Sequence, residues 1–380
     1  MIYILVIFGV GYVLYRYIRE INRSYKKLSI EQFYISDDNI PDDINLSNSE
    51  NTTLRFDKGA NKDDINLQSI NKIKKEYAEI CVNVNSTSDF KVNIFTDKNN
   101  ILHKFSVTKL INTKNKKNAI YLSGNNDYFN NKKLGMKLFD AGYNLYAISF
   151  PNLGFTADVN DSNYSTFDNI DFLFQYIEVV LKYYKINSID ILFGHSTGGL
   201  IAIMYANYKN KIKNNFIKKM ILSSPFLDYF SDPNAISYIN SENFLKNIIT
   251  PLGLIMPKIN IKPTTGQPNF TTCVEFNECN FNPKYKSLIE VKTYFQWIRA
   301  CTLAHNKIQN KKVDVKCNVI IFCSDKSVYG GYTENSDNIL DVEDIQKYGK
   351  LISYNVDIKI VKDSIHNCFL RIDISDYTKL

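Results

Sequence analysis

The stretch that decides the fold runs Ile189-Asp190-Ile191-Leu192-Phe193-Gly194-His195-Ser196-Thr197-Gly198-Gly199. Its apolar, largely β-branched first half predicts a buried strand, and the residues from about Thr197 onward predict a helix. Between the two stands the pattern Gly-x-Ser-x-Gly. A serine on so tight a turn needs glycine two residues before and after it, because a side chain there would clash. The pattern indicates a nucleophile, Ser196, on a turn formed with Gly194, His195 and Gly198.

Outward from this turn, short apolar strands alternate with helices. Strands are predicted at Ala119–Leu122, Leu145–Phe150, Ile189–Phe193, Lys219–Ser223, Val319–Cys323 and Asp357–Val361. Between them lie helical patterns such as Ile170–Tyr184. Continuous apolar strands separated by helices are typical of a mostly parallel sheet with helices on both faces, which is the α/β class.

Two segments do not follow this alternation. Residues from about 226 to 310 contain six of the chain's nine prolines and only short helical patches. This segment is too long for a simple crossover, which predicts a cap inserted into a domain over residues 86–380. Residues 21–85 are polar and rich in Asn, Asp and Ser, which predicts a linker or leader.

The first residues form an apolar run from Ile2 to Tyr15, followed by Arg16, Arg19 and Arg23. The run has no basic flank before it and no small-residue cleavage site after it, so it does not resemble a cleaved signal peptide. We therefore expect an uncleaved membrane anchor at residues 1–20. The basic flank on its C-terminal side would place the catalytic domain in the cytosol. A buried or interfacial helix is the alternative.

Composition limits the remaining classes of function. The formal net charge is +7, but basic and acidic residues alternate along the chain, so nucleic-acid binding is not expected. The seven cysteines show no CxxC pair and no metal-ligand spacing with histidine, and no metal site is expected. A reducing compartment explains them most simply, and a Cys273–Cys279 bridge stays open.

A serine hydroxyl needs a histidine base, and the chain has four histidines. His103 precedes the predicted core strands, His195 adjoins the serine and cannot turn back onto it, and His305 lies at the end of the cap. His366 follows the last predicted strand, on a loop at its carboxyl end, where catalytic groups gather in open α/β sheets. The sequence therefore favours His366.

An orienting carboxylate is expected between the serine and the histidine in chain order. Asp325 directly follows the strand Val319–Cys323 and is our predicted third member. Asp337, Asp341 and Asp344 compete, although positions in a loop or at a helix start explain them as capping residues.

An oxyanion hole requires two backbone N–H groups, of which Thr197 supplies one at the start of the helix. The second is expected after the strand Ala119–Leu122, in Ser123-Gly124-Asn125-Asn126-Asp127-Tyr128. We assign Asn125, and Asn126 is the neighbour that competes with it. A simple turn is the alternative reading.

These motifs, together with Ser224-Pro225-Phe226, Trp297-Ile298-Arg299-Ala300, Ile339–Asp344 and Ile365–Leu370, resemble the serine-aminopeptidase-like (S33) α/β hydrolases, which include monoacylglycerol lipases and lysophospholipases. The resemblance extends from about Ile101 to Leu370. Two positions depart from the family. Ser123 stands where histidine usually precedes the oxyanion glycine, and Asn367 stands where an acidic residue usually follows the triad histidine.

The resemblance implies the α/β-hydrolase fold and two-step acyl transfer to water through Ser196, Asp325 and His366, with no metal or cofactor. We expect a small-molecule carboxylic ester, lipid-like as for a monoacylglycerol or lysophospholipid, because the cap is rich in apolar residues and an anchor would lie near lipid. Two alternatives stay open. One is a peptidase or amidase, for which Glu275 and Glu278 are candidate groups for a peptide amine, and the other is a non-catalytic binding protein. The sequence does not indicate an oligomeric state.

Overall fold

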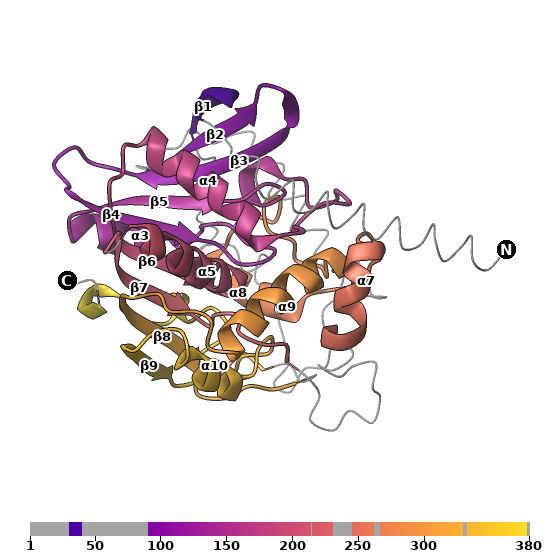
Figure 1. The fold of residues 1–380 in the computed structure, drawn as a ribbon. Helices are drawn as coiled ribbons and strands as arrows, with labels where there is room; N and C mark the ends of the chain where they lie inside the picture. The colour runs from indigo at the N-terminus through magenta and orange to yellow at the C-terminus, as the bar shows by residue number, and fades with distance from the viewer. Residues whose placement is uncertain are drawn as a thin grey trace.

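The computed structural model describes residues 30–39, 90–213, 215–230, 245–261, 267–329 and 333–377. In this part of the chain, nine strands form one sheet in the order β1-β2-β3-β5-β4-β6-β7-β8-β9 (Figure 1). The strands are β1 Phe33–Asn39, β2 Lys91–Asp97, β3 Asn100–Leu110, β4 Lys117–Leu122, β5 Tyr143–Ser149, β6 Ile189–His195, β7 Ile217–Ser223, β8 Asn318–Ser324 and β9 Val356–Val361. The pairs β1–β2, β2–β3 and β3–β5 are antiparallel, and all pairs from β5 to β9 are parallel. The predicted α/β class with a mostly parallel sheet is confirmed.

Helices cover both faces of the sheet. Those before the cap are α3 Lys132–Asp140, α4 Ile170–Tyr183 and α5 Thr197–Ile212; α10 Val342–Gly349 follows β8. One apolar core joins the sheet to α4, α5 and α10, and a second joins its other face to α3 and the C-terminal 3-10 turn Cys368–Leu370.

Burial on both faces of the sheet explains why the second part of β4, Ala119–Leu122, is apolar without interruption. Ile120 and Leu122 belong to the first core, and Ala119 and Tyr121 belong to the second. All four are buried. A strand covered on both faces has no side facing water, so it shows no polar alternation.

The long connection between β7 and β8 carries the cap helices. They are a short π-helical segment Leu245–Ile249, α7 Thr250–Ile255, α8 Phe270–Cys279 and α9 Phe295–Gln309. In Figure 1, α7 and α9 stand beyond one end of the sheet. A third apolar cluster, including Phe276 and Phe281, packs this region onto Tyr128 and Ile365 of the core domain.

A strand also lies inside the segment predicted as a linker. β1 pairs with β2 from Phe33 opposite Asp97 to Asn39 opposite Lys91. Phe33 is buried against Phe95 and Phe105, whose rings lie 6.4 and 5.4 Å from its own. Phe33, together with the partly buried Ile35, thus fixes this largely polar strand to the core at the sheet edge. A 3-10 turn, Ile30–Gln32, precedes β1, and the predicted linker residues before 30 and from 40 to 85 lie outside the described ranges.

The predicted membrane anchor at residues 1–20 also lies outside the described residues. Within the ranges that the structure describes, no helix is both long and apolar enough to cross a bilayer. The structure therefore gives no support to the expected transmembrane segment, membrane partner and membrane localisation, and we withdraw that prediction.

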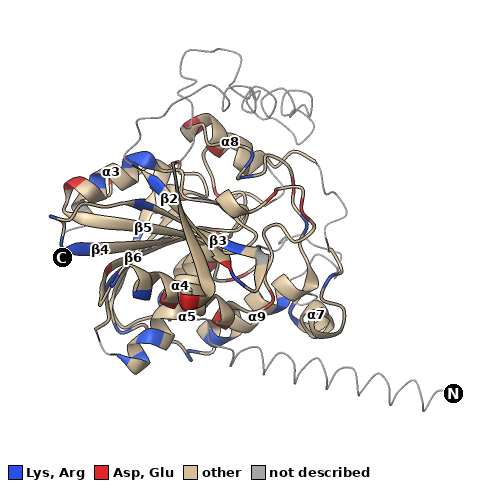
Figure 2. Cartoon of the chain, turned by 90° about the horizontal axis from the view of Figure 1, so that it is seen from above, with Lys and Arg blue, Asp and Glu red and all other residues tan. Residues whose placement is uncertain are grey.

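Basic and acidic residues are interspersed over the helices (Figure 2). Lys209 of α5 pairs with Glu178 of α4 at 2.6 Å, and Lys307 of α9 pairs with Asp171 of α4 at 3.3 Å. Each of these pairs is locally neutral, so the pairs do not change the formal net charge of +7.

Candidate active site

Ser196 occupies the turn between β6 and α5. Its backbone has φ 53° and ψ −122°, a conformation that a residue with a Cβ adopts only under strain of about 1–3 kcal/mol. The turn is held by the neighbouring strand β7, since the Ser196 N–H donates to the carbonyl of Ser223 at 3.0 Å. The side chain of Ser196 is buried at the end of a pocket. Strain of this kind, at the carboxyl end of a central strand, is typical of a positioned nucleophile.

The flanking glycines are required by contact distances. A Cβ on Gly198 would lie 2.1 Å from the Leu122 carbonyl oxygen, and one on Gly194 would lie 2.7 Å from the Gly199 Cα. Both contacts are with backbone, which cannot move aside. The turn therefore packs directly on the end of β4, where the oxyanion donors are expected.

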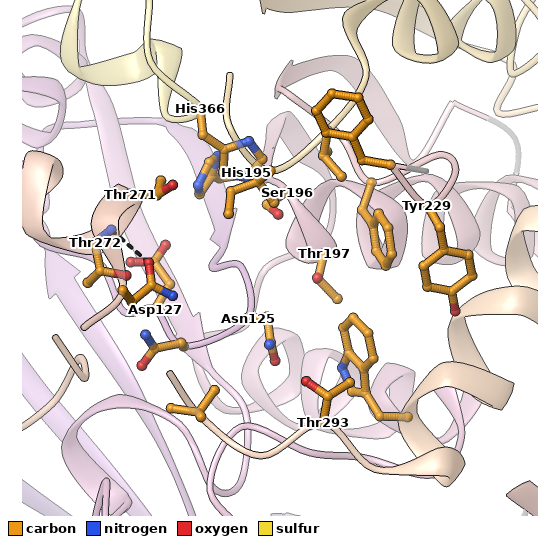
Figure 3. A pocket seen from close by; sticks show the side chains of 18 of the residues that line it. Asn125, Asp127, His195, Ser196, Thr197, Tyr229, Thr271, Thr272, Thr293 and His366 are labelled. Atoms are coloured by element: carbon orange, nitrogen blue, oxygen red, sulfur yellow. Dashed lines mark hydrogen bonds between the residues drawn. The ribbon is translucent and has the colours of Figure 1, made fainter. Parts of the chain in front are cut away.

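His366 lies on the loop after β9 and lines the same pocket as Ser196 (Figure 3). Its Nδ1 is 2.9 and 3.0 Å from the two carboxylate oxygens of Asp337. Asp337 is fully buried, and its Oδ1 also accepts the backbone N–H groups of Ile339 and Leu340, both at 2.9 Å. Nδ1 therefore carries a proton toward Asp337, which leaves Nε2 of His366 as the basic nitrogen.

The predicted partner of His366 was Asp325, and here the structure differs. Asp325 is exposed, and its Oδ1 accepts the backbone N–H of Asp363 at 2.9 Å. The chain continues past the end of β8, and a bridge between Ser327 and Asp337 brings the later aspartate back toward the sheet. The carboxylate on His366 is Asp337, one of the three competitors.

The pKa of His366 follows from two opposing effects. Burial disfavours the charged imidazolium, but the charge of Asp337 and its hydrogen bond outweigh burial and raise the pKa above its ordinary value. The neighbouring His195 behaves in the opposite way. Burial lowers its pKa well below the usual range, and its Nδ1 lies 3.3 Å from the Ser223 carbonyl oxygen. His195 is thus a neutral wall residue, with its ring 4.9 Å from that of His366.

The loop after β4 approaches the serine closely. A Cβ on Gly124 would lie 3.2 Å from the Ser196 Cβ. Asn126 has φ 49°, and its backbone N–H donates to Ser165 Oγ at 2.5 Å, so it is not directed at the pocket. Asn125 and Thr197 both line the pocket. Of the two candidates on this loop, the geometry favours Asn125.

The pocket has a volume of about 340 Å³ and two unlike sides. In Figure 3, Tyr229 lies on one side and Asp127, Thr271 and Thr272 on the other, with Ser196 between them. The apolar side also includes Phe226, whose ring lies 5.2 Å from that of Tyr229, Trp297, whose ring lies 5.7 Å from that of Phe226, and Ile298, whose carbonyl accepts the Tyr229 hydroxyl. An ester placed at Ser196 would thus have one apolar and one polar environment for its two halves.

The family model for serine aminopeptidase S33 matches residues 115–369. The chain belongs to this family. It is therefore an α/β-hydrolase-fold protein and a hydrolase, and the S33 resemblance expected from its motifs is confirmed. None of the curated proteins matches the chain.

Among solved structures, the S33 chain is similar to a monoacylglycerol lipase from Paleococcus ferrophilus, with 16% identity and a TM-score of 0.49. That alignment covers 71% of this chain and 93% of the lipase. It is also similar to a soluble variant of monoglyceride lipase from Saccharomyces cerevisiae, with 17% identity, a TM-score of 0.48, and 70% and 85% of the two chains covered.

The two departures from the S33 pattern are both buried. Within the described part of the chain, neither Ser123 Oγ nor Asn367 Oδ1 has a hydrogen-bond partner.

The remaining two histidines, His305 and His103, do not line the pocket of Ser196. His305 Nε2 is 3.0 Å from the Phe226 carbonyl oxygen, and His103 Nε2 is 2.6 Å from the hydroxyl of Tyr176.

A buried ionic cluster on the polar side was not expected from the sequence. Lys286 of the cap donates to Asp127 at 2.8 Å and to Glu275 at 2.5 Å, and all three side chains are about 4% exposed. Asp127 belongs to the loop of Gly124 and accepts that residue's N–H at 3.4 Å. Asp127 stands in the run already singled out, but no sequence pattern marks Lys286, 159 residues further along.

The same cap segment holds the oxyanion loop through Asn126. The Asn126 amide donates to the Ser287 carbonyl at 2.9 Å and accepts the Ser287 N–H at 2.8 Å. Tyr164 also donates to Asn126 at 2.7 Å, and Ser165 donates to Asn125 Oδ1 at 2.6 Å. The loop that would bind the oxyanion is therefore fixed by contacts from two other segments.

Proposed function

We propose that this S33 hydrolase is a serine esterase, with Ser196 as nucleophile, His366 as general base and Asp337 as the orienting carboxylate. The observation that carries the proposal is the combination of a strained Ser196 with a buried His366–Asp337 pair on one pocket. A strained serine alone would be a structural feature. A histidine held in the required tautomer beside it supplies the base that the hydroxyl needs.

The reaction would proceed in two acyl-transfer steps. His366 takes the Ser196 proton as Ser196 attacks the ester carbonyl, and the imidazolium then gives the proton to the leaving alcohol. Water attacks the acyl-enzyme with His366 again as base, which releases the acid and restores the serine. The N–H groups of Thr197 and Asn125 would bind the oxyanion in both steps.

The lining of the pocket supports a lipid-like ester. Phe226, Tyr229, Trp297 and Ile298 offer an apolar surface for an acyl chain, and Asp127, Thr271 and Thr272 lie on the opposite side. A monoacylglycerol or lysophospholipid has the same division between a chain and a polar alcohol.

Peptidase activity is less well supported than esterase activity. A peptidase would need a free carboxylate to bind the amine of a peptide, and the candidates from the sequence were Glu275 and Glu278. Glu275 is bound to Lys286 at 2.5 Å. Glu278 accepts the Nε of Arg371 at 3.0 Å. Each carboxylate already has a cation as its partner, so neither is available to a substrate amine.

The test is hydrolysis of a series of p-nitrophenyl esters by the wild type and by Ser196→Ala. We expect turnover that disappears in the variant, with the highest kcat/KM for medium or longer acyl chains. A folded wild-type protein that hydrolyses no ester in the series would contradict the proposal and favour a non-catalytic binding protein.

A further inference from the structure

The polar side of the pocket has an unusual balance of charge. Lys286 is the sole Lys or Arg among the described residues that line the pocket, and it is buried. It donates to Asp127 and to Glu275, so its single positive charge is already shared between two carboxylates. The three side chains together carry a formal charge of −1.

The catalytic pair does not supply a cation either. Asp337 is buried against His366, and together they are neutral or negative according to whether the imidazole is protonated. His195, the other histidine in the wall, stays neutral because burial lowers its pKa well below the usual range. Among the described residues that line the pocket, no side chain therefore presents an uncompensated positive charge.

A phosphate on the substrate would need such a charge. A phosphate-bearing alcohol carries negative charge at neutral pH, and buried anions require paired cations or several N–H donors. Freeing Lys286 for this task would leave the carboxylates of Asp127 and Glu275 buried without the cation that they share, which is strongly unfavourable. Protonation of Glu275 would bring the cluster to zero charge and would still leave Lys286 bound to Asp127.

We propose that the Asp127–Lys286–Glu275 cluster selects esters by the charge of their alcohol, accepting uncharged or cationic alcohols and rejecting those that carry a phosphate. This inference rests on the proposed esterase function and narrows it. It separates the two lipid classes that the sequence left together, since a monoacylglycerol has an uncharged alcohol and a lysophospholipid carries a phosphate.

The size of the effect follows from Coulomb's law. Two like charges about 8 Å apart in a protein pocket repel enough to lower a rate constant about 30-fold. We therefore expect kcat/KM for an anionic ester to be about 30-fold below that for an uncharged ester with the same acyl chain. A cationic alcohol should be accepted at least as well as the uncharged one.

The experiment compares three soluble octanoyl esters: 1-octanoylglycerol, octanoylcholine and 1-octanoylglycerol 3-phosphate. The readout is the ratio of kcat/KM values within one enzyme, which cancels any general loss of activity. Glu275→Gln keeps the shape of the side chain and removes the net negative charge, so it should reduce the preference for octanoylglycerol over its phosphate about 30-fold, to a ratio near one. Asp127→Asn is a second variant with the same expected direction, should Glu275→Gln fail to fold.

Glu278→Gln is the matched control, because Glu278 lies on the same helix α8 but pairs with Arg371 outside the pocket. It should keep the wild-type ratio. Equal rates on all three esters, or a ratio that the Glu275 and Asp127 variants do not move, would overturn charge selection. Turnover of p-nitrophenyl octanoate in the same preparation identifies a working esterase, so these results would leave the proposed function intact. No turnover of any ester would contradict both.

Discussion

At the scale of single residues, the arrangement depends on which carboxylate contacts His366. Asp337 is buried and lies 2.9 Å from Nδ1, whereas Asp325 is exposed and binds the backbone of Asp363. A carboxylate acts through the tautomer that it fixes and the imidazolium that it stabilises, so only a direct contact has this effect.

We expect Asp337→Asn to lower kcat by about 10³- to 10⁴-fold, because an amide would no longer hold the proton on Nδ1. The Asp325→Asn variant should stay within about threefold of wild type. Steady-state kinetics on a p-nitrophenyl ester compare the two directly. Loss of activity in Asp325→Asn with Asp337→Asn little changed would restore the sequence-based assignment.

The pH dependence provides an independent check. His366 acts as a base only when neutral, and its pKa is raised above the ordinary 6.5 because Asp337 outweighs the effect of burial. Activity should therefore be lost as pH falls through a value above 6.5. Glu275 and Lys286 also act on His366, in opposite directions. In Asp337→Asn, removal of the negative charge should move the acid limb of kcat/KM to lower pH, and a limb that does not move would exclude the pairing.

The contrast between Ser196 and Asp337 shows what sequence can provide at this scale. Ser196 lies in a pattern whose spacing is fixed by close backbone contacts, since a Cβ at Gly198 would meet the Leu122 carbonyl. His366 was found by elimination among four histidines. Asp337 belongs to a loop of variable path between β8 and α10, where three aspartates compete and only the three-dimensional path of the chain separates them.

At the scale of elements, the parallel strands and their helices were predictable because burial on both faces leaves continuous apolar runs. Edge strand β1 was not, because it is a largely polar segment that Phe33 and the partly buried Ile35 attach to the core. The contacts between the cap and the oxyanion loop could not be predicted from the sequence either. Lys286 and Ser287 meet the loop of Asn125–Asp127 across about 160 residues, and no local pattern records such a pairing.

That contact makes a prediction about the cap. Lys286→Met leaves Asp127 and Glu275 buried without a cation and should lower the free energy of unfolding by about 3–5 kcal/mol. Lys326→Met is a suitable control, since Lys326 pairs with Asp363 at 2.8 Å with both side chains about half exposed, and its loss should leave the stability close to that of the wild type. Urea unfolding measures both, and equal small effects would show that the cluster does not hold the cap to the oxyanion loop.

At the scale of the whole molecule, the cysteines of the described core are in the reduced thiol form. Six cysteines in the described residues are free thiols, Cys273 and Cys279 among them, so the disulfide left open by the sequence is not formed. Burial raises the pKa of Cys323 to about 12 and that of Cys368 to about 11. A buried, protonated thiol is a poor nucleophile.

We expect the five buried cysteines to resist iodoacetamide at pH 7.5 in the native protein and to react fully in denaturant. The five are Cys273, Cys301, Cys317, Cys323 and Cys368. Peptide mass spectrometry after timed alkylation gives the extent at each site. Rapid alkylation of native Cys301 or Cys323 would show that the core opens far more readily than its packing implies.

The most direct test of the account is the site of covalent capture by a fluorophosphonate probe, followed by peptide mass spectrometry. The account predicts one adduct, on Ser196, which is absent in Ser196→Ala and forms much more slowly in Asp337→Asn. An adduct on a different residue, or ester hydrolysis that continues in Ser196→Ala, would contradict it.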